Sequence, residues 1–279
     1  MGTLPLRGPA VRDLGLPLPP GSMPRWRAGR PLKRWRYVGV YTPELMLCVG
    51  DARVGPVPQR FWAVALPGGA LRERTTFGSG GVSLRDSAVL VDAPGVRIEL
   101  ELEESEGVET ASPVNARGAY IWTRKQACVP VSGHVELDGR RQAIDGDVGF
   151  VDDSAGYHAR HTTWRWSAGI GKAVDGRPLG WNLVTGLHDA VAASERTLWV
   201  AGETIEAGPV RFAADLCSIE IEGGGELRFE EWSRREHSTS ALVMRSRYSQ
   251  PFGSFGGTLP GGIQLAEGYG VMEAHDVRW

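Results

Sequence analysis

The run Val96-Arg97-Ile98-Glu99-Leu100-Glu101-Leu102-Glu103 decides the fold class that the sequence predicts. Aliphatic and charged side chains alternate through all of it. A period of two is typical of a β-strand with one buried face and one solvated face. Residues 88–92 and the turn Ala93-Pro94-Gly95 come directly before it. A β-hairpin is therefore expected over residues 88–103.

Hairpin signals recur along the rest of the chain. Residues 131–137 and 140–144 flank Asp138-Gly139, a dipeptide that suits the positive φ angles of a tight turn. Further strand-like runs, several of them paired around glycine turns, cover 35–42, 44–49, 60–66, 147–151, 162–170, 178–187, 217–222, 226–229, 241–248 and 263–279. Many short strands separated by turns predict an all-β fold, built as an antiparallel barrel or sandwich.

The composition supports this fold class. The chain of 279 residues holds 38 glycines and 18 prolines, which helix interiors tolerate poorly. A helical bundle or coiled coil is thereby excluded as the main architecture. Helical patterning is thin: residues 188–198 are expected to hold about two or three turns, and the charge-rich run 229–237 is ambiguous. The hydrophobic fraction of 42% provides ample material for a core.

Charge and hydropathy limit the partners that we expect. The chain has 31 basic and 33 acidic residues, but residues 1–36 carry eight basic groups against Asp13 alone. The net-acidic remainder argues against a protein that coats nucleic acid. Residues 1–24 form a proline-rich arm without an apolar signal region, and no run approaches the ~18 apolar residues of a membrane span. We expect no nucleic acid, no integral membrane segment and a cytoplasmic protein.

Neither a metal nor a cofactor is expected. Cys48, Cys128 and Cys217 are far apart in the sequence and form no CxxC pair, which favours free buried thiols over a zinc or redox site. The sequence also lacks a GxSxG elbow, a GxGxxG turn after a strand, a phosphate-binding P-loop and an HExxH motif.

The densest polar cluster runs from Asp152 to Trp166. Asp153 with His158 or His161 could act as a general acid/base pair, because an imidazole beside a carboxylate titrates near neutral pH. Hydrogen bonding to neighbouring loops is an equally weighted alternative. A metal site is disfavoured, because an offset of three residues puts the two histidines on opposite faces of a strand.

Aromatic side chains follow this cluster directly. Trp164 and Trp166 lie two residues apart and share one face of the expected strand, and Trp181 lies on the next hairpin arm. Such residues can form the wall of a cavity for an apolar ligand, although plain core packing is the alternative for each of them. The candidate polar groups of that cavity are Asn182, Arg124, Tyr157 and His161.

Several motifs in fixed order resemble an uncharacterised bacterial family, domain-of-unknown-function family 2804. They span about residues 25–279 and comprise Leu32-Lys33-Arg34-Trp35-Arg36-Tyr37, Trp122-Thr123-Arg124-Lys125, Asp153-Ser154-Ala155-Gly156-Tyr157, Thr162-Thr163-Trp164-Arg165-Trp166, Gln250-Pro251-Phe252-Gly253-Ser254-Phe255-Gly256-Gly257 and Gly270-Val271-Met272-Glu273-Ala274-His275. The resemblance implies a fold of two lipocalin-like β halves, which form a single unit over residues 25–279. We expect a junction between the halves near 202–208.

The chain more distantly resembles the lipocalin-like group of hydroxyneurosporene synthase, a carotenoid hydratase, and cofactor-free Diels–Alder cyclases. In that group a polar Asp–His motif before a Trp-containing strand lies by the ligand cavity. The nearest match here is the run from Asp152 to Trp166, but Asp153 is followed by Ser154 rather than by histidine.

Three functions remain open from the sequence. The first is binding of a hydrophobic small molecule, of lipid, isoprenoid or polyketide type, in a Trp-lined cavity. The second is a cofactor-independent lyase, hydratase or cyclase that uses Asp153 with His158 or His161 in the same cavity. The third is a structural or protein-interaction domain, which would have a filled core and an exposed apolar patch. Whether the barrel interior is hollow, and which polar groups line it, discriminates among them.

Overall fold

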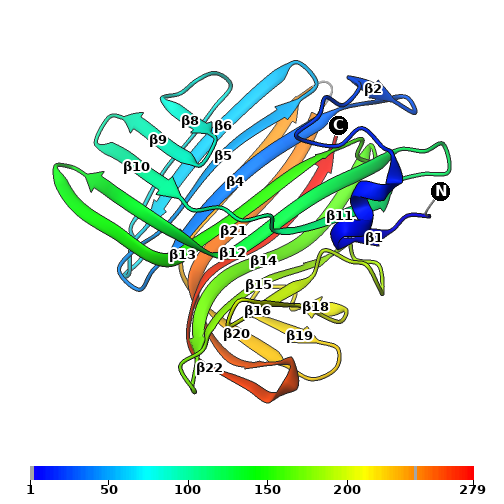
Figure 1. Cartoon of the computed structure of the whole chain (residues 1–279). Coiled ribbons are helices and arrows are strands. Elements are labelled where there is room, and N and C mark those ends of the chain that lie inside the picture. Colours follow the sequence, from blue (N-terminus) through cyan, green and yellow to red (C-terminus); the bar gives the residue numbers. More distant parts are fainter. Residues whose placement is uncertain (1–2, 242–243) are drawn as a thin grey trace.

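The computed structural model describes residues 3–241 and 244–279, and antiparallel β-strands dominate it (Figure 1). These residues form an 11-stranded sheet, a 9-stranded sheet and a 2-stranded ribbon. The protein is thus an all-β protein with two curled, lipocalin-like β halves packed together. The expectation of an antiparallel fold is confirmed.

The first sheet contains the N-terminal half of the chain, in the order β7-β6-β5-β4-β13-β12-β10-β9-β8, and β11 joins β12 to β1. Its strands are β1 (Leu6–Arg7), β4 (Lys33–Tyr41), β5 (Met46–Val54), β6 (Val57–Ala65), β7 (Leu71–Thr76), β8 (Val82–Arg85), β9 (Ala88–Ala93), β10 (Val96–Leu102), β11 (Val108–Pro113), β12 (Tyr120–Leu137) and β13 (Arg140–Gly156). The predicted hairpin is present as β9 and β10, and the aliphatic residues of β10 are buried.

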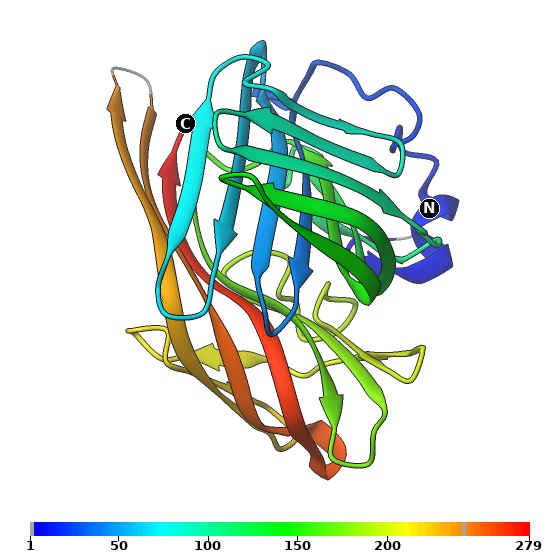
Figure 2. The same cartoon turned by 90° about the vertical axis from the view of Figure 1, so that its left-hand side faces the viewer.

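The second sheet contains the C-terminal half, in the order β17-β16-β15-β14-β22-β21-β20-β19-β18. Its strands are β14 (His161–Ala173), β15 (Pro178–Thr185), β16 (Thr197–Val200), β17 (Glu203–Glu206), β18 (Val210–Phe212), β19 (Ser218–Ile221), β20 (Glu226–Ala241), β21 (Met244–Leu259) and β22 (Ile263–Arg278). The strand predicted over 241–248 includes residues 242–243, which lie outside the described residues. In Figure 2 the long strands β20, β21 and β22 run beside the first sheet.

The chain passes between the two sheets at 157–160, between β13 and β14. Residues 202–208, where we expect a junction, contain β17, which is an edge strand of the second sheet. The N-terminal arm carries the 3-10 helix η1 (Gly8–Leu14) and leads to the ribbon of β2 (Trp26–Arg27) and β3 (Arg30–Pro31). A short 3-10 turn, η2 (Pro260–Gly262), links β21 to β22. Within 3–241 and 244–279, no helix has the length and apolarity that a membrane crossing requires.

Residues 188–196 are not helical, and the prediction of helical turns there is wrong. They form an irregular loop between β15 and β16, closed by a backbone hydrogen bond from Glu195 N to His188 O of 3.1 Å. The Asn182 side chain also donates to the Glu195 carbonyl at 2.8 Å. Tertiary hydrogen bonds thus satisfy this backbone in place of a helix. The loop brings His188 and Glu195 to the space between the sheets.

The core is divided among separate clusters of buried side chains. One cluster fills the inside of the first half, around Val38, Ile98 and Val131. Another fills the second half, around Trp181, Leu198 and Phe255. A third cluster lies between the two sheets and contains residues of both. Its members include Tyr37, Tyr41, Met46, Cys48, Ala63, Ala65, Phe150, Trp166, Ala168, Val184, Phe252 and Val271. The candidate site lies beside this third cluster.

Candidate functional site between the two sheets

A cavity of about 190 Å³ lies between the two sheets and is lined by residues of both. The first sheet provides lining residues from β4, β5, β6, β7, β12 and β13, and the second from β14, β15, β20, β21 and β22. The loop after β15 adds His188 and Glu195. Its aromatic lining residues are Trp35, Tyr37, Phe61, Trp164, Trp166, Tyr248 and Trp279.

Strand pairing fixes the tryptophans of β14 in this wall. Trp166 Nε1 donates a hydrogen bond to Asn182 Oδ1 on β15 at 2.7 Å. The rings of Trp166 and Tyr37 pack edge to face, with their centroids 5.5 Å apart. Trp164 lies opposite His275 in the β14–β22 ladder, with their ring centroids 4.3 Å apart. Both indoles line the cavity, in keeping with their two-residue spacing.

A buried ion-pair cluster forms one side of the cavity. Lys125 Nζ lies 2.6 Å from Asp152 Oδ1 and 3.6 Å from Glu195 Oε1. Burial alone would lower the pKa of Lys125, but the two carboxylates outweigh it and raise that pKa. Burial raises the pKa of Asp152, against the opposing effect of Lys125. Two carboxylates thus share one ammonium group away from water.

Glu273 on β22 is a second buried carboxyl group in the wall. It accepts hydrogen bonds from Trp164 Nε1 at 2.8 Å and from Gln250 Nε2 at 3.2 Å. Burial raises its pKa to about 7, because desolvation penalises the carboxylate more than the hydrogen bond from Trp164 stabilises it. Glu273 therefore changes protonation near neutral pH.

Burial holds three imidazoles in or beside the cavity wall neutral, those of His158, His188 and His275. Burial lowers the pKa of His188 to about 3 and that of His275 to about 4. Burial also holds the pKa of His158 well below its usual range, and the charge of Lys33 lowers it further. His158 stacks against Trp35 with ring centroids 4.8 Å apart, and its Nε2 has no hydrogen-bond partner among the described residues.

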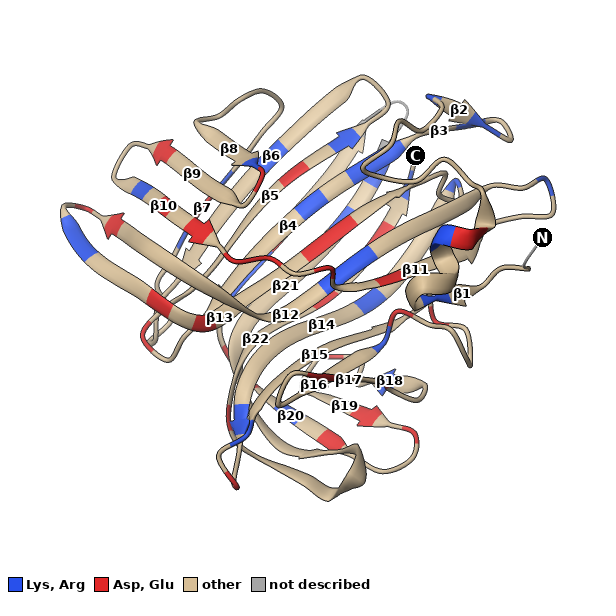
Figure 3. Ribbon diagram, in the orientation of Figure 1, with Lys and Arg blue, Asp and Glu red and all other residues tan. Residues whose placement is uncertain are grey.

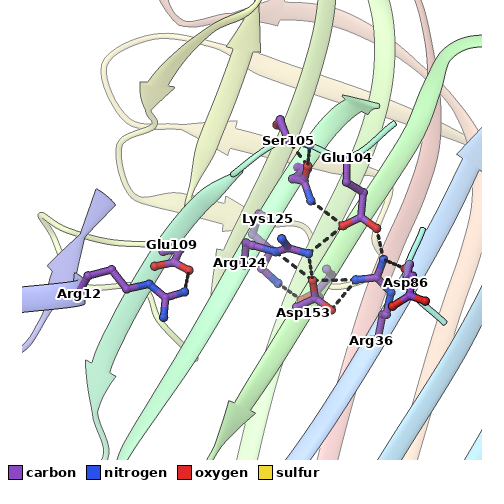
Figure 4. A network of polar contacts seen from close by, with 11 residues as sticks. Arg12, Arg36, Asp86, Glu104, Ser105, Glu109, Arg124, Lys125 and Asp153 are labelled. Atoms are coloured by element: carbon purple, nitrogen blue, oxygen red, sulfur yellow. Dashed lines mark hydrogen bonds and ion pairs between the residues drawn. The ribbon is translucent and has the colours of Figure 1, made fainter. Parts of the chain in front are cut away.

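The predicted residues Asp153 and Arg124 lie on the opposite face of the first sheet. Arg36, Asp153 and Arg124 are neighbours across β4, β13 and β12. Asp153 accepts from Arg36 Nη1 at 2.9 Å and from Arg124 Nη2 at 2.7 Å, and Glu104 pairs with both arginines (Figure 4). Figure 3 shows such basic and acidic segments on neighbouring strands of this sheet. The residues next to these three in the chain, Tyr37, Asp152 and Lys125, form the equivalent row across the same strands, and this row faces the cavity.

The other predicted residues are dispersed. His161 is exposed and hydrogen-bonded to Asp276 at 2.8 Å. Tyr157 is buried under the N-terminal arm, where its hydroxyl donates to Pro24 O at 2.8 Å. Trp181 is fully buried in the core of the second half. Asn182 is also buried, and its side chain accepts the hydrogen bond from Trp166. Asp153, His158 and His161 do not meet one another in any described contact.

Sequence reasoning missed several residues of this wall, namely Lys33, Lys125, Glu195, Glu273 and His275. A signal was present for two of them, because Glu273 and His275 are two residues apart in a β run and so share a face. Asp152 begins the polar run of the sequence, but the acid/base hypothesis uses its neighbour Asp153 instead. No group of three or more metal-ligating side chains occurs in the part of the chain that the structure describes.

A larger hollow of about 950 Å³ lies on the other face of the first sheet, beside the N-terminal arm. Its lining includes Arg36, Arg124 and Asp153, which form ion pairs with one another and with Glu104. The arm closes part of its mouth through the Arg12–Glu109 ion pair. The smaller cavity is the better candidate site, because it combines an aromatic wall with buried groups whose pKa values are shifted.

Comparison with known proteins assigns the family. The model of the family named Domain of unknown function (DUF2804) matches residues 73–279. The chain belongs to the DUF2804 family. No curated protein matches its sequence. The resemblance seen in the sequence motifs is thereby confirmed.

Solved structures similar to this DUF2804 protein share its fold at low sequence identity. A candidate AttH protein from Nitrosomonas europaea is 14% identical, with a TM-score of 0.51 over 94% of this chain and 98% of that one. Kievitone hydratase from Nectria haematococca is 12% identical, with a TM-score of 0.56 over 87% and 88%. CghA is 11% identical, with a TM-score of 0.49 over 98% and 97%.

Proposed function

We propose that this DUF2804 protein binds a hydrophobic small molecule, of lipid, isoprenoid or polyketide type, in the cavity between its two sheets. The observation that supports this most directly is the aromatic wall, to which Trp35, Trp164, Trp166 and Trp279 all contribute. Indole rings provide large apolar areas at a small cost in conformational entropy. At about 190 Å³ the cavity is smaller than the roughly 300–1,000 Å³ of drug-sized sites, so it suits a small ligand or one end of a longer one.

The polar groups of the wall would orient the ligand. Glu273 in its protonated form can donate one hydrogen bond, and the Lys125–Asp152–Glu195 cluster offers a fixed dipole. Glu195 Oε2 has no hydrogen-bond partner among the described residues. A hydroxyl group on an otherwise apolar ligand would satisfy this buried acceptor.

The experiment is ligand capture followed by mass spectrometry. The purified protein is incubated with several lipid extracts, separated from unbound material, and the retained species are identified. Thr75→Trp should block the cavity, because Thr75 lines it from β7. Arg74→Trp is the matched control, since Arg74 is the exposed neighbour of Thr75 on the same strand. Enrichment of the same species by wild type and Arg74→Trp, but not by Thr75→Trp, supports the proposal, whereas no enriched species in any extract contradicts it.

A second candidate is a cofactor-independent lyase, hydratase or cyclase that uses the same cavity. The specific observation in its favour is Glu273, a cavity-lining acid whose pKa is raised to about 7 beside the neutral imidazole of His275. A carboxyl group that titrates near working pH is suited to general acid/base chemistry. Kievitone hydratase, by its name a hydratase, has the same fold. Conversion of a captured ligand by wild type, but not by Glu273→Gln, would favour this candidate over simple binding.

A further inference from the structure

Lys33, the first residue of β4, is a buried lysine in the wall of the cavity. Its exposed fraction is 2%, and its Nζ lies 3.7 Å from the centroid of the Trp279 ring. It shares a strand face with Trp35 and Tyr37, which also line the cavity. The amine therefore lies among aromatic side chains rather than in solvent.

Lys33 has no carboxylate partner among the described residues. The charged or titratable groups that face it are Arg30, whose charge opposes an ammonium group there, and His158, which burial keeps neutral. The Trp279 ring attracts an ammonium group, but an aromatic face offsets only part of the cost of burying its charge. Desolvation and Arg30 lower the pKa of Lys33 to about 7.

Lys125 is the contrasting case within the same cavity. It is equally buried, but Asp152 and Glu195 surround its ammonium group and raise its pKa. The third lysine of the chain, Lys172, is exposed on β14 beside Glu267. Among these lysines, only Lys33 combines burial with the absence of a described counter-charge.

We propose that Lys33 is a covalent attachment site for carbonyl compounds, apolar aldehydes or ketones, that enter the cavity. This inference rests on the proposed function, because it requires that the cavity admits a small apolar molecule. The neutral amine adds its lone pair to the carbonyl carbon, and the resulting carbinolamine loses water to form an imine. The carbonyl oxygen leaves in that water molecule, together with both amine hydrogens. No oxidant or reductant is needed.

The test uses cinnamaldehyde as the probe, with sodium cyanoborohydride to reduce any imine to a stable secondary amine. Peptide mapping by mass spectrometry then locates the reduced imines, which can form at three lysines and the amino terminus and differ in mass from conjugate adducts of the three free cysteines. At pH 7.5 we expect modification of Lys33 to be at least about tenfold faster than that of Lys172, because most of the Lys33 amine is neutral at that pH. Lys125 should stay unmodified. The Lys33 rate should level off above about pH 7.5, where its amine is mostly neutral.

Lys33→Met should remove the adduct without changing the modification of Lys172, and its melting temperature shows whether the fold is retained. Cinnamyl alcohol, which lacks the carbonyl group, separates the two proposals by measuring entry into the cavity alone. Binding of the alcohol without an adduct at Lys33 overturns the covalent proposal and leaves the proposed binding function standing. Equal labelling of Lys33 and Lys172, or no labelling of Lys33 while the alcohol also fails to bind, overturns it as well.

Discussion

Trp164 on β14 and Glu273 on β22 are joined by a hydrogen bond of 2.8 Å from the indole Nε1 to the carboxyl Oε1. The bond connects neighbouring strands of the second sheet and holds both side chains in the cavity wall. It ties the position of an aromatic wall residue to a carboxyl group that titrates near neutral pH. Protonation of Glu273 therefore affects both stability and the polarity of the cavity.

The first prediction concerns pH. Since burial raises the pKa of Glu273 from its ordinary value of 4.5 to about 7, the folded state binds a proton more tightly than the unfolded state. This contribution to stability is fully present below about pH 4.5 and is lost as the pH rises through 7. The free energy of unfolding of Glu273→Gln minus that of wild type should therefore increase by up to about 3 kcal/mol between pH 4.5 and pH 8. Urea unfolding of both proteins at the two pH values measures this, and parallel pH profiles would contradict it.

The second prediction concerns the buried ion-pair cluster. Lys125→Met should lower the free energy of unfolding by about 3–5 kcal/mol, because Asp152 and Glu195 stay buried without their counter-charge. The loss should become smaller as the pH falls, because burial raises the pKa of Asp152 and its protonation relieves part of the repulsion. Lys172→Met, which removes an exposed partner of Glu267, is the control and should cost less than about 0.5 kcal/mol. Similar losses in the two variants would show that Lys125 has no special electrostatic role.

The third prediction concerns the support of Trp166. Trp166→Phe should lower the free energy of unfolding by about 1–3 kcal/mol, because the buried Asn182 Oδ1 loses the 2.7 Å hydrogen bond from the indole. It should also weaken ligand capture, since the indole lines the cavity. The control is Trp26→Phe on β2, where the side chain is 66% exposed. Thermal and urea unfolding check the stability, and an unchanged midpoint for Trp166→Phe would contradict the structural role.

The fourth prediction separates the two faces of the first sheet. Asp153→Asn should lower the free energy of unfolding by about 1–2 kcal/mol through its weakened pairing with Arg36 and Arg124. Ligand affinity should change by less than about twofold, because Asp153 lies on the face away from the cavity. Asp152→Asn, one residue earlier, should change affinity more, since Asp152 lines the cavity. Equilibrium binding of a captured ligand to both variants decides this, and a larger effect of Asp153→Asn would favour the sequence-based hypothesis.

Much of the local structure could be predicted from short-range patterns. Alternation over residues 96–103 predicts β10 and its buried face, and the two-residue spacing of Trp164 and Trp166 predicts that they share a wall. The prediction of helical turns over 188–198 was wrong, because a hydrogen bond from Asn182 and hydrogen bonds within the loop replace those of a helix. The polar residues of the candidate site were harder to predict than the tryptophans of its wall.

The sequence by itself determined the all-β class, the hairpins and which residues alternate, because these depend on the two-residue period of a strand and on turn chemistry. It could not decide whether Asp152 or Asp153 faces inward, since alternation separates the two faces without saying which one a second sheet will cover. Only the tertiary structure decided that, by packing β14 and β22 against the face that holds Lys125 and Asp152. The same long-range packing buried Lys33 without a described counter-charge and placed Glu273 against Trp164.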